Sequence, residues 1–327
     1  MYLNSTKVLL VNTMMIGVIM VNCSNNWISM WMGLELALIS FIPLMQSENP
    51  LSSEAMIKYF IVQSIASTMF LFSIAIMLVG DSMMAELNEI ILTTSMLVKL
   101  GSAPFHSWVL MILEPLEIFP LLTLLTVLKL PPLIVMHQIN TKILTVPILL
   151  GMIIGSVAAL NQTSVRKTLG YSSIYNMSLL MIIISSTIET TLFLTMYTLM
   201  MVVLGKSIKT MKINYVNQII ANNFNGWVKL TLWINMLSMA GFPPLMGFFM
   251  KMMAMQKAIN ENQTLMLLAL VMTSMLVLLF YMRLTFTSLL TFNSLKKWSL
   301  LTKSTSQFMF LLNIVVTPVL CSSMINL

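Results

Sequence analysis

Long apolar stretches, separated by short polar or Pro/Gly-containing segments, make up almost the whole chain. Such stretches are typical of helices that cross a membrane, because a hydrocarbon core of ~30 Å requires about 20 helical residues. The pattern predicts an all-α polytopic membrane protein with about eleven transmembrane helices. Their approximate bounds are 8–21, 25–45, 56–79, 90–111, 118–136, 144–160, 170–185, 190–204, 228–255, 264–290 and 308–324.

Composition leaves no room for a sizeable soluble domain. Of the 327 residues, 58% are hydrophobic and 8% are charged, whereas about a quarter of the residues in soluble proteins are charged. We expect one membrane domain over residues 1–327, with two five-helix units at 1–140 and 141–290 and a loop and last helix at 291–327. The first apolar stretch lacks a small-residue cleavage site, which favours a retained helix over a signal peptide.

The basic residues give the expected orientation. The net charge of +7 does not indicate nucleic acid binding, because the basic residues lie in short inter-helix segments and not in one solvated patch. Alternating the helices places most of them on the side of the N-terminus, and Lys and Arg remain on the side of synthesis. That side receives Lys7, Lys58, Arg166, Lys167, Lys206, Lys209, Lys212, Lys229, Lys296, Lys297 and Lys303, and the opposite side Lys142 and Lys257.

The 35 methionines lie largely where Leu or Ile would serve as well. Mitochondrial codes that read AUA as Met would produce this usage. We therefore expect a protein of the mitochondrial inner membrane, with its N-terminus in the matrix and its C-terminus in the intermembrane space.

Redox chemistry is not expected in this chain. Its two cysteines, Cys23 and Cys321, lie far apart in the sequence, and with two histidines they do not form a metal or iron–sulfur ligand set. The sequence also contains no Gly-rich phosphate loop or dinucleotide fingerprint. We predict no cofactor and no metal in this chain, so its energy must come from partner subunits or from another gradient.

Apart from Lys58 and Lys229, at the starts of their spans, five charged residues fall inside predicted spans, namely Glu35, Lys99, Lys129, Lys251 and Arg283. A charge at the centre of a transmembrane helix costs roughly 2.5–3.5 kcal/mol on insertion scales, so several imply pairing, hydration or use. A structural ion pair that fixes helix packing is the alternative to a functional site. Arg283 lies near the end of its span and is expected to extend to the interface or to pair structurally.

Two of these lysines lie beside interruptions in their helices. Gly101 and Pro104 follow Lys99, and Gly241, Pro243 and Pro244 precede Lys251. Proline frees a backbone carbonyl, and interrupted membrane helices mark ion sites in transporters. A simple proline kink is the alternative. The two spans are five helices apart and therefore antiparallel, as an inverted repeat of five helices requires.

The predicted chemistry is proton relay. A lysine in a low-dielectric site binds its proton less tightly, and a nearby carboxylate opposes that effect. Glu35 could control Lys99 in this way, and Lys129 could pass the proton onward to Lys251. His106 could join the relay, or it could hydrogen-bond carbonyls freed at the first interruption.

Four segments carry a resemblance to a known family: 30–35, 97–108, 160–167 and 241–248. In order and spacing they resemble subunit 2 of mitochondrial NADH:ubiquinone oxidoreductase, one of the antiporter-like membrane subunits of respiratory complex I. The Met-rich composition fits an insect version. One departure is the pair Pro131 and Pro132 directly after Lys129, where a single proline would be more familiar.

The resemblance implies an inverted pair of five-helix units that lacks three N-terminal helices of bacterial relatives. It matches Glu35 to the family's glutamate, Lys99 and Lys251 to the lysines of its two broken helices, and Lys129 to its connecting lysine. His106 matches a histidine beside the first break. Other membrane-arm and accessory subunits, with the bilayer and its cardiolipin, are the implied partners. NADH, FMN, iron–sulfur clusters and ubiquinone are implied in partner subunits.

Two rival functions remain open from the sequence. A stand-alone cation/proton antiporter would use the same Glu and Lys residues without a redox partner. A structural membrane subunit would keep the helices and tolerate neutral residues at the charged positions.

Overall fold

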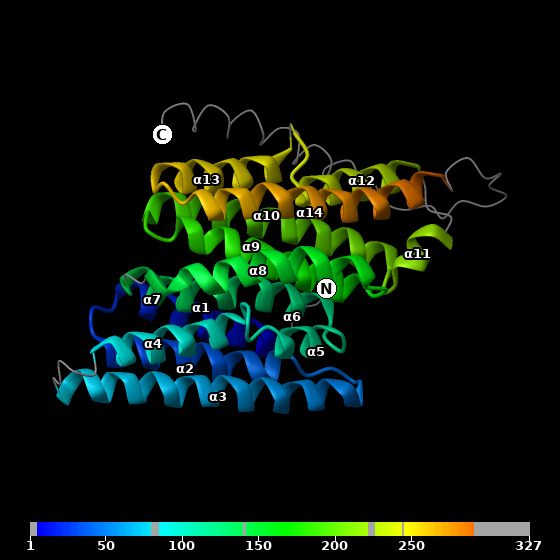
Figure 1. The fold of residues 1–327 in the computed structure, drawn as a ribbon. Coiled ribbons are helices and arrows are strands. Elements are labelled where there is room, and N and C mark those ends of the chain that lie inside the picture. The colour runs from blue at the N-terminus through cyan, green and yellow to red at the C-terminus, as the bar shows by residue number, and fades with distance from the viewer. Residues whose placement is uncertain (1–4, 80–84, 140–141, 222–225, 244, 291–327) are drawn as a thin grey trace. The chain divides into compact units, whose positions relative to one another are not determined.

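The computed structural model is helical throughout the part of the chain that it describes (Figure 1), which comprises residues 5–79, 85–139, 142–221, 226–243 and 245–290. Within these residues the β structure is limited to an isolated bridge between Ser164 and Tyr215. The chain divides into two compact units between Ile148 and Leu149. The inverted relation between the two units stays a prediction.

The first unit is built from consecutive helices. They are α1 (Ser5–Cys23), α2 (Trp27–Leu44), α3 (Pro50–Val79), α4 (Ala85–Leu100), α5 (Ser107–Leu113), α6 (Ile118–Leu125), the 3-10 turn η2 (Val127–Lys129), α7 (Leu130–Gln138) and the 3-10 turn η3 (Lys142–Leu144). Within this unit α2 and α4 both pack against α3 and α7, and α1 packs against α2 and α7. The interior therefore lies between α2, α3, α4 and α7 (Figure 1).

The boundary between the units falls inside α8 (Thr145–Val157), which continues as the 3-10 turn η4 (Ala158–Asn161). The second unit then contains α9 (Val165–Ile183), α10 (Thr187–Met211), α11 (Val216–Ala221), α12 (Gly226–Ala240), α13 (Met246–Asn260) and α14 (Thr264–Leu290). In it α13 packs against α9, α10, α12 and α14. Lys251 of α13 is therefore surrounded by helices.

Six segments of the described chain are long and apolar enough to cross a membrane. They are Ser5–Cys23, Trp27–Leu44, Pro50–Val79, Ile118–Gln138, Thr187–Met211 and Thr264–Phe286. The class of all-α membrane protein is confirmed, but the predicted count of eleven spans is not. Some predicted spans are divided into shorter helices, and the last one, 308–324, lies outside the described residues.

The two predicted helix interruptions have the same backbone geometry. Gly101 ends α4 with φ +63°, and Gly241 ends α12 with φ +75°. In each case the glycine N–H donates to the carbonyl three residues before it, and the next N–H donates to the carbonyl five residues before itself. This is the Schellman arrangement, in which a glycine without a Cβ takes the left-handed conformation.

A third interruption adds to the two that the sequence predicts. The span that carries Lys129 changes from α6 to the 3-10 turn η2 and then to α7, which begins at Leu130. Pro131 and Pro132 explain the change, because proline has no N–H and fits only the first turn of a helix. Without those donors, the carbonyls of Val127 and Leu128 lose their α-helical partners.

Close contact between α1 and α2 depends on Gly17 and Gly33. A Cβ built on Gly33 would lie 2.9 Å from the Gly17 carbonyl oxygen and 2.6 Å from a methyl carbon of Val21. A Cβ on Gly17 would lie 2.8 Å from the Gly33 oxygen. Small residues at such positions let membrane helices approach closely.

We therefore expect Gly33→Ala to separate α1 from α2 and to destabilise the fold by about 1–3 kcal/mol, as overpacking of a tight interior does. Thermal unfolding of the solubilised assembly would measure the loss. Ile39→Ala is the matched control, because Ile39 lies on the same helix and is 65% exposed. Equal stability of the two variants would contradict the close-contact argument.

Candidate functional site

A buried ion pair joins α2 to the end of α4. Lys99 lies in the last turn of α4 and is 7% exposed. Its Nζ is 3.8 Å from Oε1 of Glu35, whose side chain is 22% exposed. The first helix interruption thus begins two residues after a lysine that faces a carboxylate on a neighbouring helix.

Lys99 also lines a small cavity inside the first unit. The cavity offers ≈ 30 Å³ to the centres of water molecules, which is room for about two waters at ~10–15 Å³ each. Its lining is made of side chains from α2, α3, α4, α5, α6, η2 and α7: Leu34, Ala37, Leu38, Tyr59, Gln63, Lys99, Leu100, Trp108, Leu124, Leu128, Lys129, Pro131 and Pro132. Two of the predicted relay lysines therefore line one cavity.

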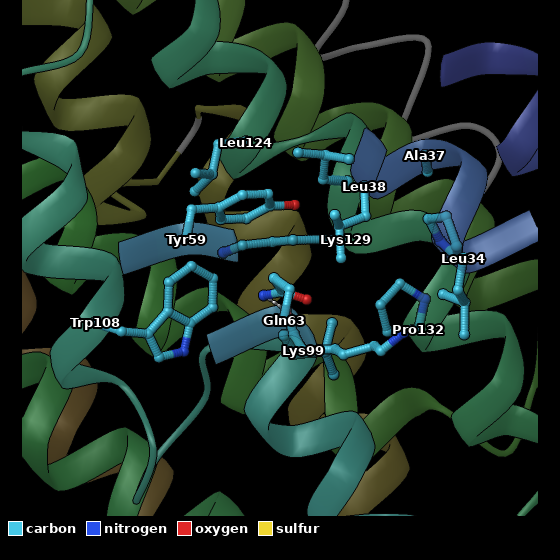
Figure 2. A pocket seen from close by; sticks show the side chains of 13 residues that line it. Leu34, Ala37, Leu38, Tyr59, Gln63, Lys99, Trp108, Leu124, Lys129 and Pro132 are labelled. Atoms are coloured by element: carbon cyan, nitrogen blue, oxygen red, sulfur yellow. Dashed lines mark hydrogen bonds between the residues drawn. The ribbon is translucent and has the colours of Figure 1, made fainter. Parts of the chain in front are cut away.

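Lys129 enters this cavity from the third interruption. It is the last residue of η2 and is 4% exposed. Figure 2 shows its side chain between the ring of Tyr59 and the amide of Gln63, with Lys99 on the other side of Gln63. The interruption that Pro131 and Pro132 impose thus places Lys129 within the same lining as Lys99.

Neutral donors bind the carbonyls at the end of α4. Trp108 donates its Nε1–H to the Val98 carbonyl at 3.1 Å, and the Ser102 hydroxyl lies 3.3 Å from the Leu97 carbonyl. Gln63 donates its Nε2–H to the Lys99 carbonyl at 3.4 Å. The carbonyls of Val98 and Leu97 also accept the backbone N–H bonds of the turn, whereas Gln63 gives the Lys99 carbonyl a partner from another helix, as an apolar environment requires.

His106 lies within the first interruption, half-buried, with Nδ1 3.2 Å from the Pro104 carbonyl oxygen. It is not among the side chains that line the cavity. This contact corresponds to the predicted alternative, a histidine that hydrogen-bonds a carbonyl at the break. A part for His106 in the relay stays a prediction.

At the second interruption, the Lys251 amine is bound by backbone carbonyls and not by a carboxylate. The Lys251 Nζ donates to the Ala240 carbonyl at 2.5 Å and lies 3.4 Å from the Ser274 carbonyl, and the ring centroid of Tyr175 is 5.9 Å away. A Cβ on Gly241 would lie 2.7 Å from Lys251 Cε. Gly241 therefore provides both the left-handed turn and the space for the lysine. Pro243 lies in that turn, and Pro244 is outside the described residues.

Glu35, Lys99 and Lys129 thus lie together in the first unit, and Lys251 belongs to the second. Sequence analysis did not single out Gln63, Tyr59 or Tyr175. Gln63 could have been found as an amide within an apolar span, four residues after Tyr59 and so on the same helix face.

Two other basic residues, Arg283 and Lys229, lie outside this group. Arg283 is exposed on α14, in agreement with its exclusion from the site. Lys229 was counted with the inter-helix basic residues, although the predicted span 228–255 includes it. In the structure it is 3% exposed near the start of α12, so it is a further buried lysine within a helix.

The first unit therefore combines the groups that proton exchange requires. A carboxylate and two amines can each bind and release a proton, and a cavity of water size can hold the molecules that carry it between them.

Comparison with known proteins agrees with this arrangement. A family model described as NADH:quinone oxidoreductase/Mrp antiporter matches residues 24–277. A protein of Locusta migratoria named NADH-ubiquinone oxidoreductase chain 2 is 35% identical over 292 residues, which cover 86% of this chain and 85% of the relative. A protein of Anopheles gambiae with the same name is 36% identical over 276 residues and 81% of each chain.

Among solved structures, a chain of respiratory complex I from Thermus thermophilus superimposes with a TM-score of 0.79 at 21% identity. The match covers 86% of this chain and 70% of that one, and it supports the fold. The matched residues 24–277 include all four predicted relay residues and both predicted interruptions. The chain belongs to the NADH:quinone oxidoreductase/Mrp antiporter family of membrane proteins, and within it to the relatives named NADH-ubiquinone oxidoreductase chain 2.

Proposed function

We propose that this chain is a membrane-arm subunit of respiratory complex I, in which Glu35, Lys99, Lys129 and Lys251 relay protons across the membrane. The observation that carries the proposal is the buried Lys99–Glu35 pair at a helix interruption, beside a cavity that Lys129 also lines. Family membership supplies the setting, because the relatives are named for NADH-ubiquinone oxidoreductase.

The arrangement favours a relay over a purely structural subunit. A buried pair contributes little net stability once desolvation is counted, and a structural pair requires neither a cavity nor an interrupted helix. Lys129 and Lys251 also lie at interruptions, where non-helical backbone persists in a membrane only if it is buried in protein or lines water. The location of all three lysines at helix interruptions supports a functional role for their charges.

In the proposed order, Glu35 controls the loading of Lys99, Lys129 receives the proton, and Lys251 carries it onward. A carboxylate near an amine favours the ammonium form, so a change in the distance between Glu35 and Lys99 changes how readily Lys99 gives up its proton. Lys251 is bound by backbone carbonyls, which accept hydrogen bonds from an ammonium group without carrying a full charge.

Transport against a membrane potential requires a driving force of about 2.3 kcal/mol per charge per 100 mV. In this proposal it comes from electron transfer between NADH and ubiquinone in partner subunits, which hold the FMN and the iron–sulfur clusters. This chain holds no cofactor. It lies in the mitochondrial inner membrane among other complex I subunits and lipids that include cardiolipin, with its N-terminus in the matrix and its C-terminus in the intermembrane space.

The first prediction concerns assembly. After gentle solubilisation of the membranes and native separation, the chain should migrate together with NADH-dependent, quinone-reducing activity. Detection by an antibody or a tag on the chain, combined with an in-gel activity stain, would measure this. Migration as a free small protein would favour a stand-alone antiporter instead.

The second prediction concerns the buried pair. Lys99→Met should slow NADH-driven proton pumping per assembled complex at least about 100-fold, because a proton-transferring group typically contributes that much. Glu35→Gln should slow it by a factor on the order of ten, the size of the effect of one nearby charge on proton binding. Pumping is measured in proteoliposomes with a pH-sensitive dye.

Lys58→Met is the control for Lys99→Met. Lys58 forms an exposed ion pair with Glu54 on α3, 2.5 Å long, and exposed pairs of this kind contribute little. Pumping by both the Lys99 and the Glu35 variants at the rate of this control, in fully assembled complex, would rule out their part in the relay.

The third prediction concerns the second unit. Lys251→Met should abolish most proton pumping while assembly is retained, because methionine fills the space but carries no proton. Lys257→Met tests specificity, since Lys257 lies on the same helix and pairs with Glu261 at 3.8 Å near the surface. If the two variants lose pumping equally, the loss reflects damage to α13 and not a relay through Lys251.

A further inference from the structure

Gln63 is a buried amide on the inward face of α3. The buried residues Tyr59, Gln63, Ala66 and Phe70 of this helix recur every three or four residues and so form one stripe, which also includes the buried Ser67 beside Ala66. Gln63 is 5% exposed. Each serine of the stripe satisfies its hydroxyl on a carbonyl three residues earlier, as Ser67 does on Ser64, whereas the amide of Gln63 reaches another helix. Polar groups at such membrane positions are expensive and are associated with function.

Gln63 contacts Lys99 and shares the cavity lining with Lys129. Its Nε2–H donates to the carbonyl oxygen of Lys99 at 3.4 Å, and its side chain lines the same cavity as Lys99 and Lys129. In Figure 2 the amide lies between the two lysine side chains, with the dashed bond on its nitrogen side. The anchored nitrogen leaves the amide oxygen as an acceptor for molecules in the cavity.

The cavity provides room for those molecules. About two waters fit within its ≈ 30 Å³, and a bridging water requires two to four polar partners. The amide oxygen of Gln63 and the amines of Lys99 and Lys129 are partners of this kind. Two ammonium groups repel each other, so a neutral amide suits the space between them better than a third charge.

A purely structural role is the alternative. Amides often join membrane helices by hydrogen bonds, and Gln63 does bind α4 at the Lys99 carbonyl. A helix contact of that kind requires no cavity and no second lysine beside it. The place of Gln63 in the same cavity lining as both lysines is what the structural role leaves unexplained.

We propose that Gln63 is a positioning residue that orders the water linking Lys99 to Lys129. This inference rests on the proposed relay. In the transfer, one lysine ammonium gives a proton to a water molecule, and that water gives one of its other protons to the neutral amine of the second lysine. One N–H bond breaks and one forms, the water is regenerated, and Gln63 accepts hydrogen bonds without being protonated.

Gln63→Met tests this directly, because methionine has a similar length and no amide. The variant should pump protons about threefold to tenfold more slowly per assembled complex, which corresponds to the loss of one ordered hydrogen bond in the transfer path. Ser67→Ala is the matched control, one turn along the same stripe and absent from the cavity lining. It should pump at the rate of the unaltered protein.

Gln63→Glu distinguishes positioning from structure by its pH profile. The titratable groups that face this position are Tyr59, Lys99 and Lys129, with Glu35 beyond Lys99. At low pH a protonated carboxyl at this position donates and accepts as the amide does, so pumping should approach the unaltered rate. As pH rises, the carboxylate favours the ammonium forms of both lysines, so pumping should fall more steeply than in the unaltered protein.

Three outcomes are informative. A slow Gln63→Met variant, together with the steeper Gln63→Glu profile, supports the proposal. If Gln63→Met reduces only the amount of assembled complex, or the Gln63→Glu profile runs parallel to the unaltered one, Gln63 is structural and the proposal is wrong. Normal pumping by Lys99→Met, measured in the same preparations, would instead overturn the relay itself.

Discussion

Every polar group inside a bilayer must find its partner within the protein, because lipid offers none. This constraint explains why the interrupted helices and the buried lysines occur together. An interruption leaves carbonyls without helical partners, and a lysine or a neutral donor nearby satisfies them. Lys99 lies two residues before Gly101, Lys129 directly precedes α7, and the Lys251 amine binds the last carbonyl of α12. Each lysine of the proposed relay is thus located by a break in a helix.

The two glycine interruptions share one backbone design but distribute donors differently. At the first, neutral groups of Trp108, Ser102 and Gln63 bind the carbonyls at the end of α4, so the Lys99 amine remains available to Glu35. At the second, Lys251 itself donates to the Ala240 carbonyl. Lys99 therefore senses a carboxylate on another helix, whereas Lys251 is held by uncharged backbone. The same turn therefore occurs at two sites: proton binding by Lys99 depends on the distance to the Glu35 carboxylate, whereas Lys251 is held without a charged partner among its hydrogen bonds.

Much of this could be predicted from the sequence, because local chemistry determines it. Apolar length predicts the long helices, and Gly101 and Gly241 mark breaks through conformations that other residues rarely adopt. Other features depend on tertiary contacts. An amide within an apolar span marks Gln63 as unusual, but the sequence does not show whether such an amide lines a cavity or only joins two helices. The burial of Lys229 was missed because a charge at the very start of a predicted span does not show whether its side chain faces solvent or the interior, and the interruption before Pro131 was read as part of a continuous span.

That third interruption shows how a local rule produces a site. A continuous helix through Lys129 would bond the carbonyls of Val127 and Leu128 to the N–H groups four residues later, but Pro131 and Pro132 have no N–H. The span therefore passes through a 3-10 turn, and Leu128, Lys129 and both prolines line the cavity. The two lysine amines can donate hydrogen bonds there and the Gln63 amide can donate and accept, so a cavity with mostly apolar side chains still offers partners to water. Water that enters the cavity can bind both Lys99 and Lys129. The interruption makes this possible, because it brings Lys129 into the same cavity lining as Lys99.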